Sequence, residues 1–362
     1  MNKKLSIGII GTRGVPNQYG GYEAAVQELA PRLVDRGHEV VVYCSSLQLT
    51  RVNEWQGVKL VYNFDPEDKI GSAGQFIYDL KSNISSIKQK HDVIFHMGYT
   101  SDSIWHRFWD SNARHITNMD GMEWMRSKYS QRVRKFLKKA EKWAALKSNL
   151  LIADSVGIMD YIKRNYSTPV MNIAYGVSIP QAFDKTHLKE YGLSPNEYDL
   201  IIARIVPENN IEVSIDAKNN SDNDTPLVIF GNKNAYWYDL KNKHQDNPKI
   251  LFLDSNYDRD TMDSIRHYAR YYIHGHSVGG TNPSLLEAMA AQCKIIAHDN
   301  VFNKGVLKDG GLYFSNSNDL KEQLNNEVDF DKKLIVSNLA RLKTVYNWEN
   351  ICDQYEEAAY YK

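Results

Sequence analysis

The chain of 362 residues has no apolar run that approaches the roughly 18 residues a membrane-spanning helix needs. Its first residues, Met1-Asn2-Lys3-Lys4-Leu5, begin like a signal peptide. The apolar stretch that follows stops at Gly11, however, and no cleavage-type segment follows Arg13. We therefore expect a cytoplasmic protein.

The chain also has few cysteines and no formal net charge. The three cysteines, Cys44, Cys293 and Cys352, lie far apart without metal-ligand or Cys-x-x-Cys spacing, which favours buried single residues in a reducing compartment. Lys plus Arg and Asp plus Glu both number 44, so bulk charge gives no support for nucleic-acid binding. We expect no nucleic-acid partner.

The length exceeds that at which one hydrophobic core keeps growing, so we expect two domains. Short β-branched runs alternate with helical patterns in both halves, which predicts parallel sheets covered by helices. Pro31 lies inside the first helical pattern and should kink or shorten that helix. Residues 165–198, broken by Gly and Pro, read as a linker. The predicted strands are residues 5–10, 39–44, 58–62, 92–96, 115–118, 200–205, 227–230, 250–253, 271–274 and 294–297.

A glycine-rich loop, residues 11–23, joins the first predicted strand to the first helix. Gly20 and Gly21 precede the helix directly, where glycine permits close approach of a ligand and the helix start offers N–H groups to an anion. The glycines at 8, 11 and 14 do not form Gly-x-Gly-x-x-Gly, and the second strand ends without an acidic residue for a ribose, which argues against a nicotinamide dehydrogenase. A long mobile loop without a ligand is the alternative.

Two segments of the second half carry candidate chemistry. Arg204 ends a predicted strand, and its planar guanidinium suits a diphosphate, although an arginine in this position is often only a surface charge. Further on, a strand runs into the turn at 279–282, and Pro283 is well placed to open a helix. Glu287 then interrupts an otherwise apolar helix, which favours a carboxylate for ribose hydroxyls over a solvated side chain.

His274 and His276, two residues apart at the end of a strand, resemble metal ligands. No third ligand is close in sequence, so we expect neither a metal nor a cofactor.

These residues together resemble the retaining glycosyltransferases of family 4, over nearly the whole length of the chain. The sequences of residues 279–284 and 120–124 resemble those of one branch of this family, the bacterial rhamnosyltransferases of capsule and exopolysaccharide assembly. The motifs that carry the resemblance are Gly20-Gly21-Tyr22-Glu23, Arg36-Gly37-His38-Glu39-Val40, Ala153-Asp154-Ser155, Tyr175-Gly176-Val177, Ala203-Arg204 with Pro207-Glu208, 283–290, Trp348-Glu349-Asn350, Gly279-Gly280-Thr281-Asn282-Pro283-Ser284 and Asp120-Gly121-Met122-Glu123-Trp124.

The resemblance implies an α/β chain of the GT-B fold, with two facing Rossmann-like domains, parallel sheets and an interdomain cleft. Residues 1–178 would form the acceptor-side domain, 179–345 the nucleotide-sugar-binding domain, and 346–362 a helix that returns to the first domain. The implied reaction is retaining transfer of a sugar, L-rhamnose from dTDP-rhamnose, to a polyprenyl-diphosphate-linked saccharide. Another hexose donor, with UDP or GDP, and a nucleotide-sugar 2-epimerase of the same fold are the alternatives, followed by a degenerate binding scaffold.

The resemblance also assigns roles to individual residues. Gly20 and Gly21 would approach the donor or the acceptor, and Asp120 would orient the acceptor or the sugar. Arg204 would hold the diphosphate and act in catalysis. The donor-binding residues of the second domain would be Lys233, Gly280, Thr281, Asn282, Ser284 and Glu287.

Three positions depart from the family pattern. Gly279 stands where relatives carry a second glutamate, Asn209 where they carry a lysine, and Asp120 where many carry a histidine. Sugar recognition should therefore differ, and Lys233 or Arg259 could supply the missing positive charge.

A basic stretch, residues 126–147, holds nine Lys or Arg and a single acid, Glu141, interleaved with apolar residues. This amphipathic pattern predicts a helix that docks on anionic lipid, on the inner face of the plasma membrane. A solvated basic helix face is the alternative. The basic positions are 126, 128, 132, 134, 135, 138, 139, 142 and 147.

Overall fold

The computed structural model describes residues 3–18, 20–119, 121–126, 129–326 and 332–361. The chain divides into two compact units, Met1–Tyr175 with Trp348–Lys362 (unit 1) and Gly176–Asn347 (unit 2). The predicted boundaries fall after residues 178 and 345. In the described part of the chain, no helix is both long and apolar enough to span a bilayer.

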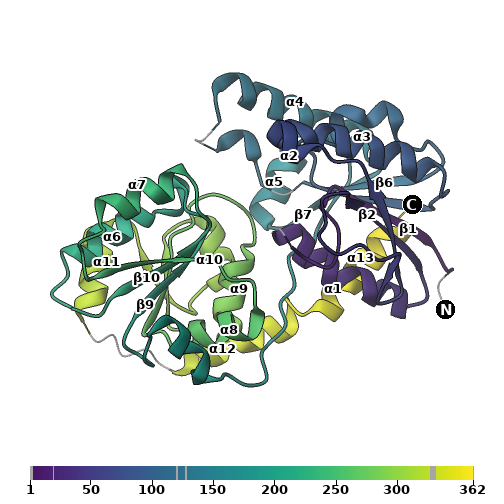
Figure 1. The fold of residues 1–362 in the computed structure, drawn as a ribbon. Coiled ribbons are helices and arrows are strands. Elements are labelled where there is room, and N and C mark those ends of the chain that lie inside the picture. Colours follow the sequence, from purple (N-terminus) through teal and green to yellow (C-terminus); the bar gives the residue numbers. More distant parts are fainter. Residues whose placement is uncertain (1–2, 19, 120, 127–128, 327–331, 362) are drawn as a thin grey trace. The chain divides into compact units, whose positions relative to one another are not determined.

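Unit 1 is built on an eight-stranded sheet in the order β3-β4-β2-β1-β5-β6-β7-β8 (Figure 1). All neighbours are parallel except β3 and β4. The central strands are buried on both faces, which explains their continuous apolar runs. The strands are β1 (Ser6–Ile10), β2 (Glu39–Ser45), β3 (Glu54–Trp55), β4 (Val58–Asn63), β5 (Val93–Met97), β6 (Arg114–Asn118), β7 (Leu150–Ala153) and β8 (Val170–Asn172).

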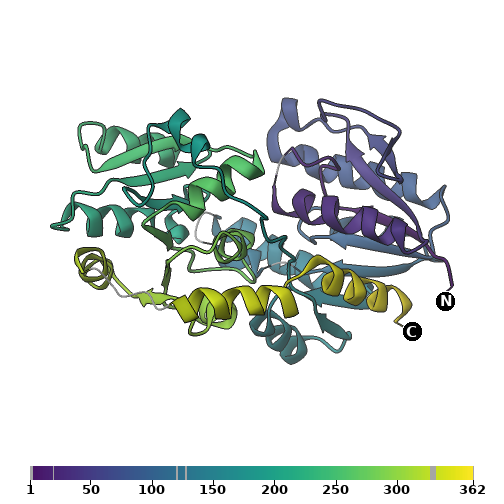
Figure 2. The ribbon, with the colours of Figure 1, turned by 90° about the horizontal axis from the view of Figure 1, so that it is seen from below.

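Among the described residues of unit 1, nine helical segments accompany this sheet. The last one, α13, is the yellow helix next to the C mark in Figure 2. It contacts α1, and its apolar side joins the core of unit 1 through Trp348, Ile351 and Tyr355. They are α1 (Gly21–Asp35), α2 (Glu67–Ile70), α3 (Gly74–Ile87), α4 (Gln131–Lys147), α5 (Val156–Asn165), α13 (Trp348–Tyr360) and the 3-10 turns η1 (Gly71–Ala73), η2 (Ser103–Phe108) and η3 (Glu123–Met125).

Helix α1 bears on the expectation that Pro31 kinks or shortens the first helix. It runs through Pro31 to Asp35, so the proline does not shorten it. Pro31 is buried with Ala30 and Leu33, and this burial in the core offsets the backbone hydrogen bond that proline cannot make.

Unit 2 has a six-stranded sheet in the order β11-β10-β9-β12-β13-β14, with every pair parallel. β9 ends at Ile202, three residues earlier than predicted, and Arg204 therefore lies in the following loop. The strands are β9 (Asp199–Ile202), β10 (Leu227–Gly231), β11 (Ile250–Asp254), β12 (Tyr271–His274), β13 (Ile295–His298) and β14 (Leu312–Phe314). The helices are η4 (Lys185–Tyr191), η5 (Pro207–Asn209), α6 (Ile211–Asn219), α7 (Ala235–Lys243), α8 (Arg259–His267), α9 (Pro283–Ala290), α10 (Val301–Leu307), α11 (Ser317–Asn325) and α12 (Lys332–Thr344).

Candidate functional site

The strand order of unit 2 reverses at β9. This first strand of the unit lies between β10 and β12, and the chain builds outward from it on both sides. In open α/β sheets, ligands bind outside the carboxyl ends of the strands at such a reversal. Arg204, Lys233 and the turn 279–282 follow β9, β10 and β12, so the structure brings these predicted residues to one edge of one sheet.

Hydrogen bonds join the loops that follow β9 and β12. The Ser284 hydroxyl donates to the Ile202 carbonyl over 3.1 Å and lies 2.6 Å from the Tyr272 hydroxyl. The Ser277 amide and hydroxyl both donate to the Glu208 carbonyl. The hydroxyl of Ser284, a predicted donor ligand, is thus turned toward the sheet, where it holds α9 against β9.

Arg204 is exposed, and the structure explains the departure at Asn209 beside it. The Asn209 side chain is 6% exposed, and its amide donates to the Arg204 carbonyl over 2.8 Å. A Cβ at Gly275 would lie 2.1 Å from the Asn209 carbonyl oxygen, so the two loops approach closely. Asn209 therefore fixes the backbone that carries Arg204.

The turn before α9 is shaped for backbone recognition. Asn282 caps the helix by accepting a hydrogen bond from the Ser284 amide over 2.9 Å, and Pro283 occupies the first turn. Thr281 is buried and Gly280 half-buried. Gly279 has a φ of 132°, which an L-residue adopts only with strain. The position at which the resemblance implies a glutamate thus has a backbone suited to glycine.

Glu287 does not stand alone on α9. Its Oε2 accepts a hydrogen bond from the guanidinium of Arg266, a buried residue of α8. Sequence reasoning did not find Arg266, because its contact with Glu287 joins two helices separated by β12 and a loop.

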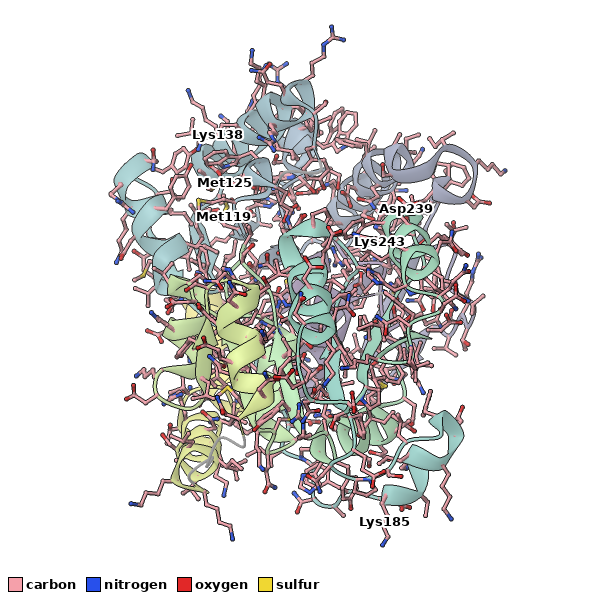
Figure 3. The ribbon with its side chains drawn as sticks, turned by 90° about the vertical axis from the view of Figure 1, so that its left-hand side faces the viewer. Met119, Met125, Lys138, Lys185, Asp239 and Lys243 are labelled. Carbon is pink, nitrogen blue, oxygen red and sulfur yellow. The ribbon has the colours of Figure 1, made fainter. Side chains whose placement is uncertain are left out.

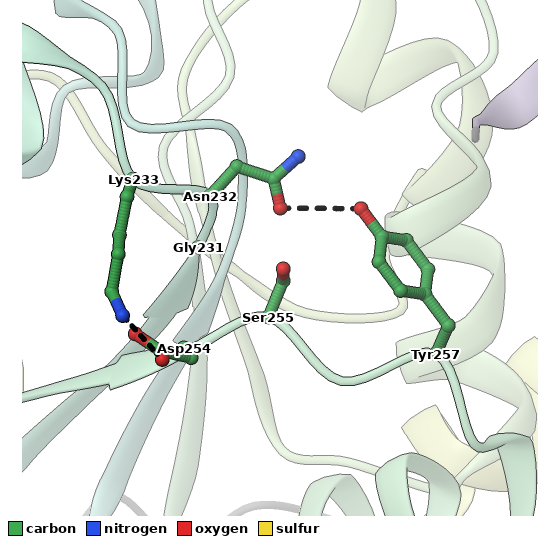
Figure 4. Close-up of a pocket in the computed structure, with 6 residues that line it drawn as sticks. All are labelled: Gly231, Asn232, Lys233, Asp254, Ser255 and Tyr257. Carbon is green, nitrogen blue, oxygen red and sulfur yellow. Dashed lines mark hydrogen bonds and ion pairs between the residues drawn. The ribbon is translucent and has the colours of Figure 1, made fainter. Parts of the chain in front are cut away.

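Lys233 lies beside a hollow of about 410 Å³ at the carboxyl ends of β10 and β11 (Figure 4). Its Nζ lies 2.6 Å from Asp254 Oδ2, and this hydrogen bond raises the pKa of Lys233. Across the hollow, the Tyr257 hydroxyl donates to Asn232 Oδ1 over 3.2 Å. The wall is polar and carries both signs of charge.

The candidate residues of unit 1 follow β1, where that sheet also reverses its order, between β1 and β5. Gly20 precedes α1 without a side-chain cap, and a Cβ at Gly21 would meet no atom of the described chain within 4 Å. The loop is anchored by Glu23, whose Oε1 accepts from the Arg13 amide over 2.6 Å. Asp120 lies outside the described residues.

The paired histidines are stacked, and His274 is buried while His276 is half-buried. The rings of His274 and His276 lie 4.3 Å apart, and burial beside His276 holds the pKa of His274 well below its usual range. Among the described residues, no group of three or more His, Cys, Asp or Glu side chains could hold a metal ion.

Two family models cover most of the chain. Residues 4–178 match "Domain of unknown function (DUF1972)", and residues 185–342 match "Glycosyl transferases group 1". Among curated proteins, the chain is 27% identical over 131 residues to a D-alanine–D-alanine ligase of Acetivibrio thermocellus. That match covers 33% of either chain, so this protein spans about a third of that relative's length.

Solved structures resemble the whole chain. Sucrose-phosphate synthase of Thermosynechococcus elongatus has a TM-score of 0.78 at 13% identity and covers 98% of both chains. Anabaena HepE, solved with UDP-glucose, has a TM-score of 0.75 at 13% identity, covering 98% of this chain and 99% of its own. Starch synthase IV of Arabidopsis thaliana, bound to ADP and acarbose, reaches 0.72 at 13% identity and covers 99% of both.

The two parallel-sheet units and these likenesses define an α/β protein of the GT-B fold. Within that class, the chain is similar to the DUF1972 model in its first part and to the glycosyl transferases group 1 model in its second, and the candidate donor residues of unit 2 all lie within the second match.

Proposed function

We propose that this protein transfers a sugar from a nucleotide-sugar donor to an acceptor. The observation that carries the proposal is the convergence of Arg204, the 279–282 turn and Glu287 at the strand-order reversal of the group 1 domain. HepE, which shares the fold, was solved with UDP-glucose and with UDP, and this supports a nucleotide-sugar ligand.

The chemistry follows from the leaving group. A nucleoside diphosphate departs with negative charge, so stabilising that charge matters more than a strong nucleophile. Arg204 is exposed at the strand edge, and the first amides of α9 present the positive end of a helix dipole. We assign retention of anomeric configuration by same-face attack, in which the leaving phosphate helps to deprotonate the acceptor and Asp120 orients the acceptor or sugar. No metal is required for these steps.

The donor we propose is dTDP-L-rhamnose. Glycine at 279 removes a carboxylate from the sugar side of the site, and loss of a hydroxyl contact suits a deoxy sugar. A UDP- or GDP-hexose donor is the alternative. Incubation of the purified protein with each nucleotide sugar, with and without a polyprenyl-diphosphate-linked saccharide, tests the proposal: sugar transfer only in the presence of the acceptor is expected. Epimer formation without an acceptor would instead identify a nucleotide-sugar 2-epimerase.

For the acceptor we propose a polyprenyl-linked saccharide reached from an anionic membrane surface. The apolar side of α4 cannot provide that contact, because Leu137, Ala140 and Ala144 are buried in the core of unit 1. The predicted amphipathic pattern is therefore explained by folding, and the lipid contact must use the opposite face.

That opposite face is basic, and α3 adds exposed isoleucines beside it. The Phe76 and Phe136 rings, 5.7 Å apart, bring α3 and α4 together. α3 exposes Ile77, Ile84 and Ile87, interleaved with Lys81. Within the described residues of α3, η2 and α4 no carboxylate is exposed, because the two acids, Asp79 and Glu141, are buried. A mixed aliphatic and cationic surface of this kind complements anionic lipid.

Vesicle sedimentation tests this contact. Lys135→Glu/Lys142→Glu should reduce binding to phosphatidylglycerol vesicles by roughly tenfold or more, since each cation near an anionic surface contributes about 1 kcal/mol. The control, Lys185→Glu/Lys189→Glu on η4, makes the same change in net charge and should bind as the wild type does. Equal binding by both variants would eliminate the proposed surface.

A further inference from the structure

The carboxylate of Glu287 stands at the end of a row of alternating charges. Arg266 donates through one terminal nitrogen to Glu287 and through the other, over 3.3 Å, to Asp263 Oδ1. Asp263 Oδ2 lies 3.5 Å from Arg259 Nε, and Arg259 donates over 2.8 Å to the Ser178 carbonyl. The row thus runs from α9 along α8 to the segment that enters unit 2.

The row becomes more exposed toward its two ends. The side chains of Arg266 and Asp263 are 6% and 8% exposed, whereas those of Glu287 and Arg259 are 40% and 48% exposed. Burial lowers the pKa of Arg266, but Glu287, Tyr272 and Asp263 outweigh burial and hold that pKa above its ordinary value. Arg266 therefore stays charged, and a charge this deeply buried requires its partners.

An unpaired glutamate in the middle of a helix would sample many rotamers. The entropy lost when a ligand orders this side chain would weaken the binding of that ligand. Arg266 removes that freedom before a ligand arrives. A carboxylate has about four lone-pair sites, so the bond from Arg266 leaves the rest free to accept hydroxyl groups.

We propose that Arg266 is a positioning residue of the donor site: it holds the Glu287 carboxylate ready for the hydroxyl groups of the nucleotide's sugar ring. Asp263 and Arg259 hold Arg266 in turn. The inference rests on the proposed function, because it needs Glu287 to bind a nucleotide. A merely structural ion pair between α8 and α9 is the competing explanation, and the two differ in which ligands they affect.

A double-mutant cycle distinguishes them, with dTDP, UDP and inorganic pyrophosphate as probes in calorimetry on the full chain. Arg266→Met should weaken binding of the preferred nucleotide roughly tenfold, the scale of coupling between residues in direct contact. In a Glu287→Gln background the same change should have little further effect. Pyrophosphate, which has no sugar ring, should bind the wild type and Arg266→Met equally.

Arg266→Lys keeps the charge but cannot reach both carboxylates as a guanidinium does, so it should fall between the wild type and Arg266→Met. The control is Arg270→Lys, at the amino end of β12, where Arg270 pairs with Asp199 over 2.8 and 2.7 Å. It also perturbs a buried ion pair of unit 2 and should leave nucleotide binding unchanged.

Equal weakening by Arg266→Met in both backgrounds, or a parallel loss of pyrophosphate binding, would overturn the inference. Weakened binding in Glu287→Gln with normal binding in Arg266→Met would also overturn it, while leaving the proposed function intact. A wild-type protein that binds neither dTDP nor UDP, and that also fails to bind GDP in the same assay, would overturn the proposed function itself.

Discussion

Arg204 and Glu287, two of the charged side chains of the proposed donor site, are held in different ways. The Glu287 carboxylate is bound by a buried arginine, whereas the exposed Arg204 is positioned through its own backbone carbonyl. The first arrangement favours a fixed acceptor of hydroxyl groups. The second leaves a long cationic side chain able to follow a diphosphate as charge develops on it.

Replacement of Arg204 should therefore separate catalysis from stability. We expect Arg204→Ala to reduce turnover by about two to three orders of magnitude, the usual cost of removing a group that stabilises transition-state charge. The melting temperature should be nearly unchanged, because the exposed side chain makes no hydrogen bond or ion pair with the described residues. Steady-state transfer kinetics and calorimetric melting check this, and near-normal turnover would remove Arg204 from the mechanism.

Glycine 279 gives a second prediction at the scale of one residue. Its φ of 132° penalises any side chain, so Gly279→Ala should destabilise unit 2 by about 1–2 kcal/mol. Gly305 provides the control, because it lies inside α10, its φ is not positive, and a Cβ there would meet nothing within 4 Å. Gly305→Ala should stabilise by about 0.5–1 kcal/mol. Thermal unfolding of both variants tests this prediction. An unchanged stability of Gly279→Ala would show that the turn accommodates a side chain without strain.

At the scale of elements, α4 does more than carry basic residues. The buried Glu141 accepts hydrogen bonds from the Trp124 indole and from the hydroxyls of Tyr161 and Tyr166, each over 2.7 Å. Lys138, labelled in Figure 3, adds an ion pair at 2.9 Å, and its Nζ lies 4.3 Å from the Trp124 ring centroid. The helix thereby holds η3, which contains Glu123 and Trp124, the last two residues of the Asp120–Trp124 motif.

Glu141→Ala should therefore destabilise unit 1 strongly. The variant leaves a lysine, an indole and two phenols without their shared acceptor, and breaking a buried pair from one side costs about 3–5 kcal/mol. For a domain of this size that corresponds to a melting temperature lowered by roughly 6–20 °C. Lys142→Ala, one residue further and exposed, is the control and should change the melting temperature little. Similar melting of the two variants would contradict this role of Glu141.

The sequence predicts most strands because a buried parallel strand leaves a continuous apolar run that needs no knowledge of its neighbours. β3, β8 and β14 escape prediction since they have only two or three residues, and β7 escapes because it begins three residues after the end of α4, so that its short apolar run adjoins the apolar pattern of that helix. Residues that meet only in the folded chain escape for another reason. The sequence around Glu287 does not indicate its contact with Arg266. At Asn209 the sequence indicates only that an expected lysine is absent, whereas the burial of this side chain shows that it supports a loop.

At the scale of the whole molecule, the pH dependence of stability depends on buried groups of unit 1 whose pKa values are shifted in opposite directions. Burial lowers the pKa of both His91 and His115 to about 4. Burial is the main cause that raises the pKa of Asp79 to about 8, and the negative charge of the nearby Asp102 is the second. Asp102 is itself bonded to Asn83 and to His96, so these groups lie close together inside the unit.

The pH dependence of stability follows from proton counting. Between about pH 4 and 6.5 the unfolded chain binds two more protons at the histidines and the native chain one more at Asp79, so stability rises with pH. Between about pH 6.5 and 8 only Asp79 contributes; the native chain binds the extra proton, and stability falls as pH rises. Unit 1 should be most stable near pH 6.5.

Asp79→Asn tests this balance directly, because asparagine keeps the shape of a protonated aspartic acid and never ionises. The wild type must either hold a proton on Asp79 or bury its charge above pH 8, and the variant does neither. We expect the two proteins to melt nearly equally near pH 4, and Asp79→Asn to melt higher than the wild type by a margin that grows as the pH rises to 8.5, as measured by scanning calorimetry of the full chain. Its stability should stop falling above pH 6.5, since the remaining contributions come from His91 and His115. Parallel pH profiles for the two proteins would mean that Asp79 is ionised in the native state at neutral pH, and the proposed maximum would then have to come from other groups.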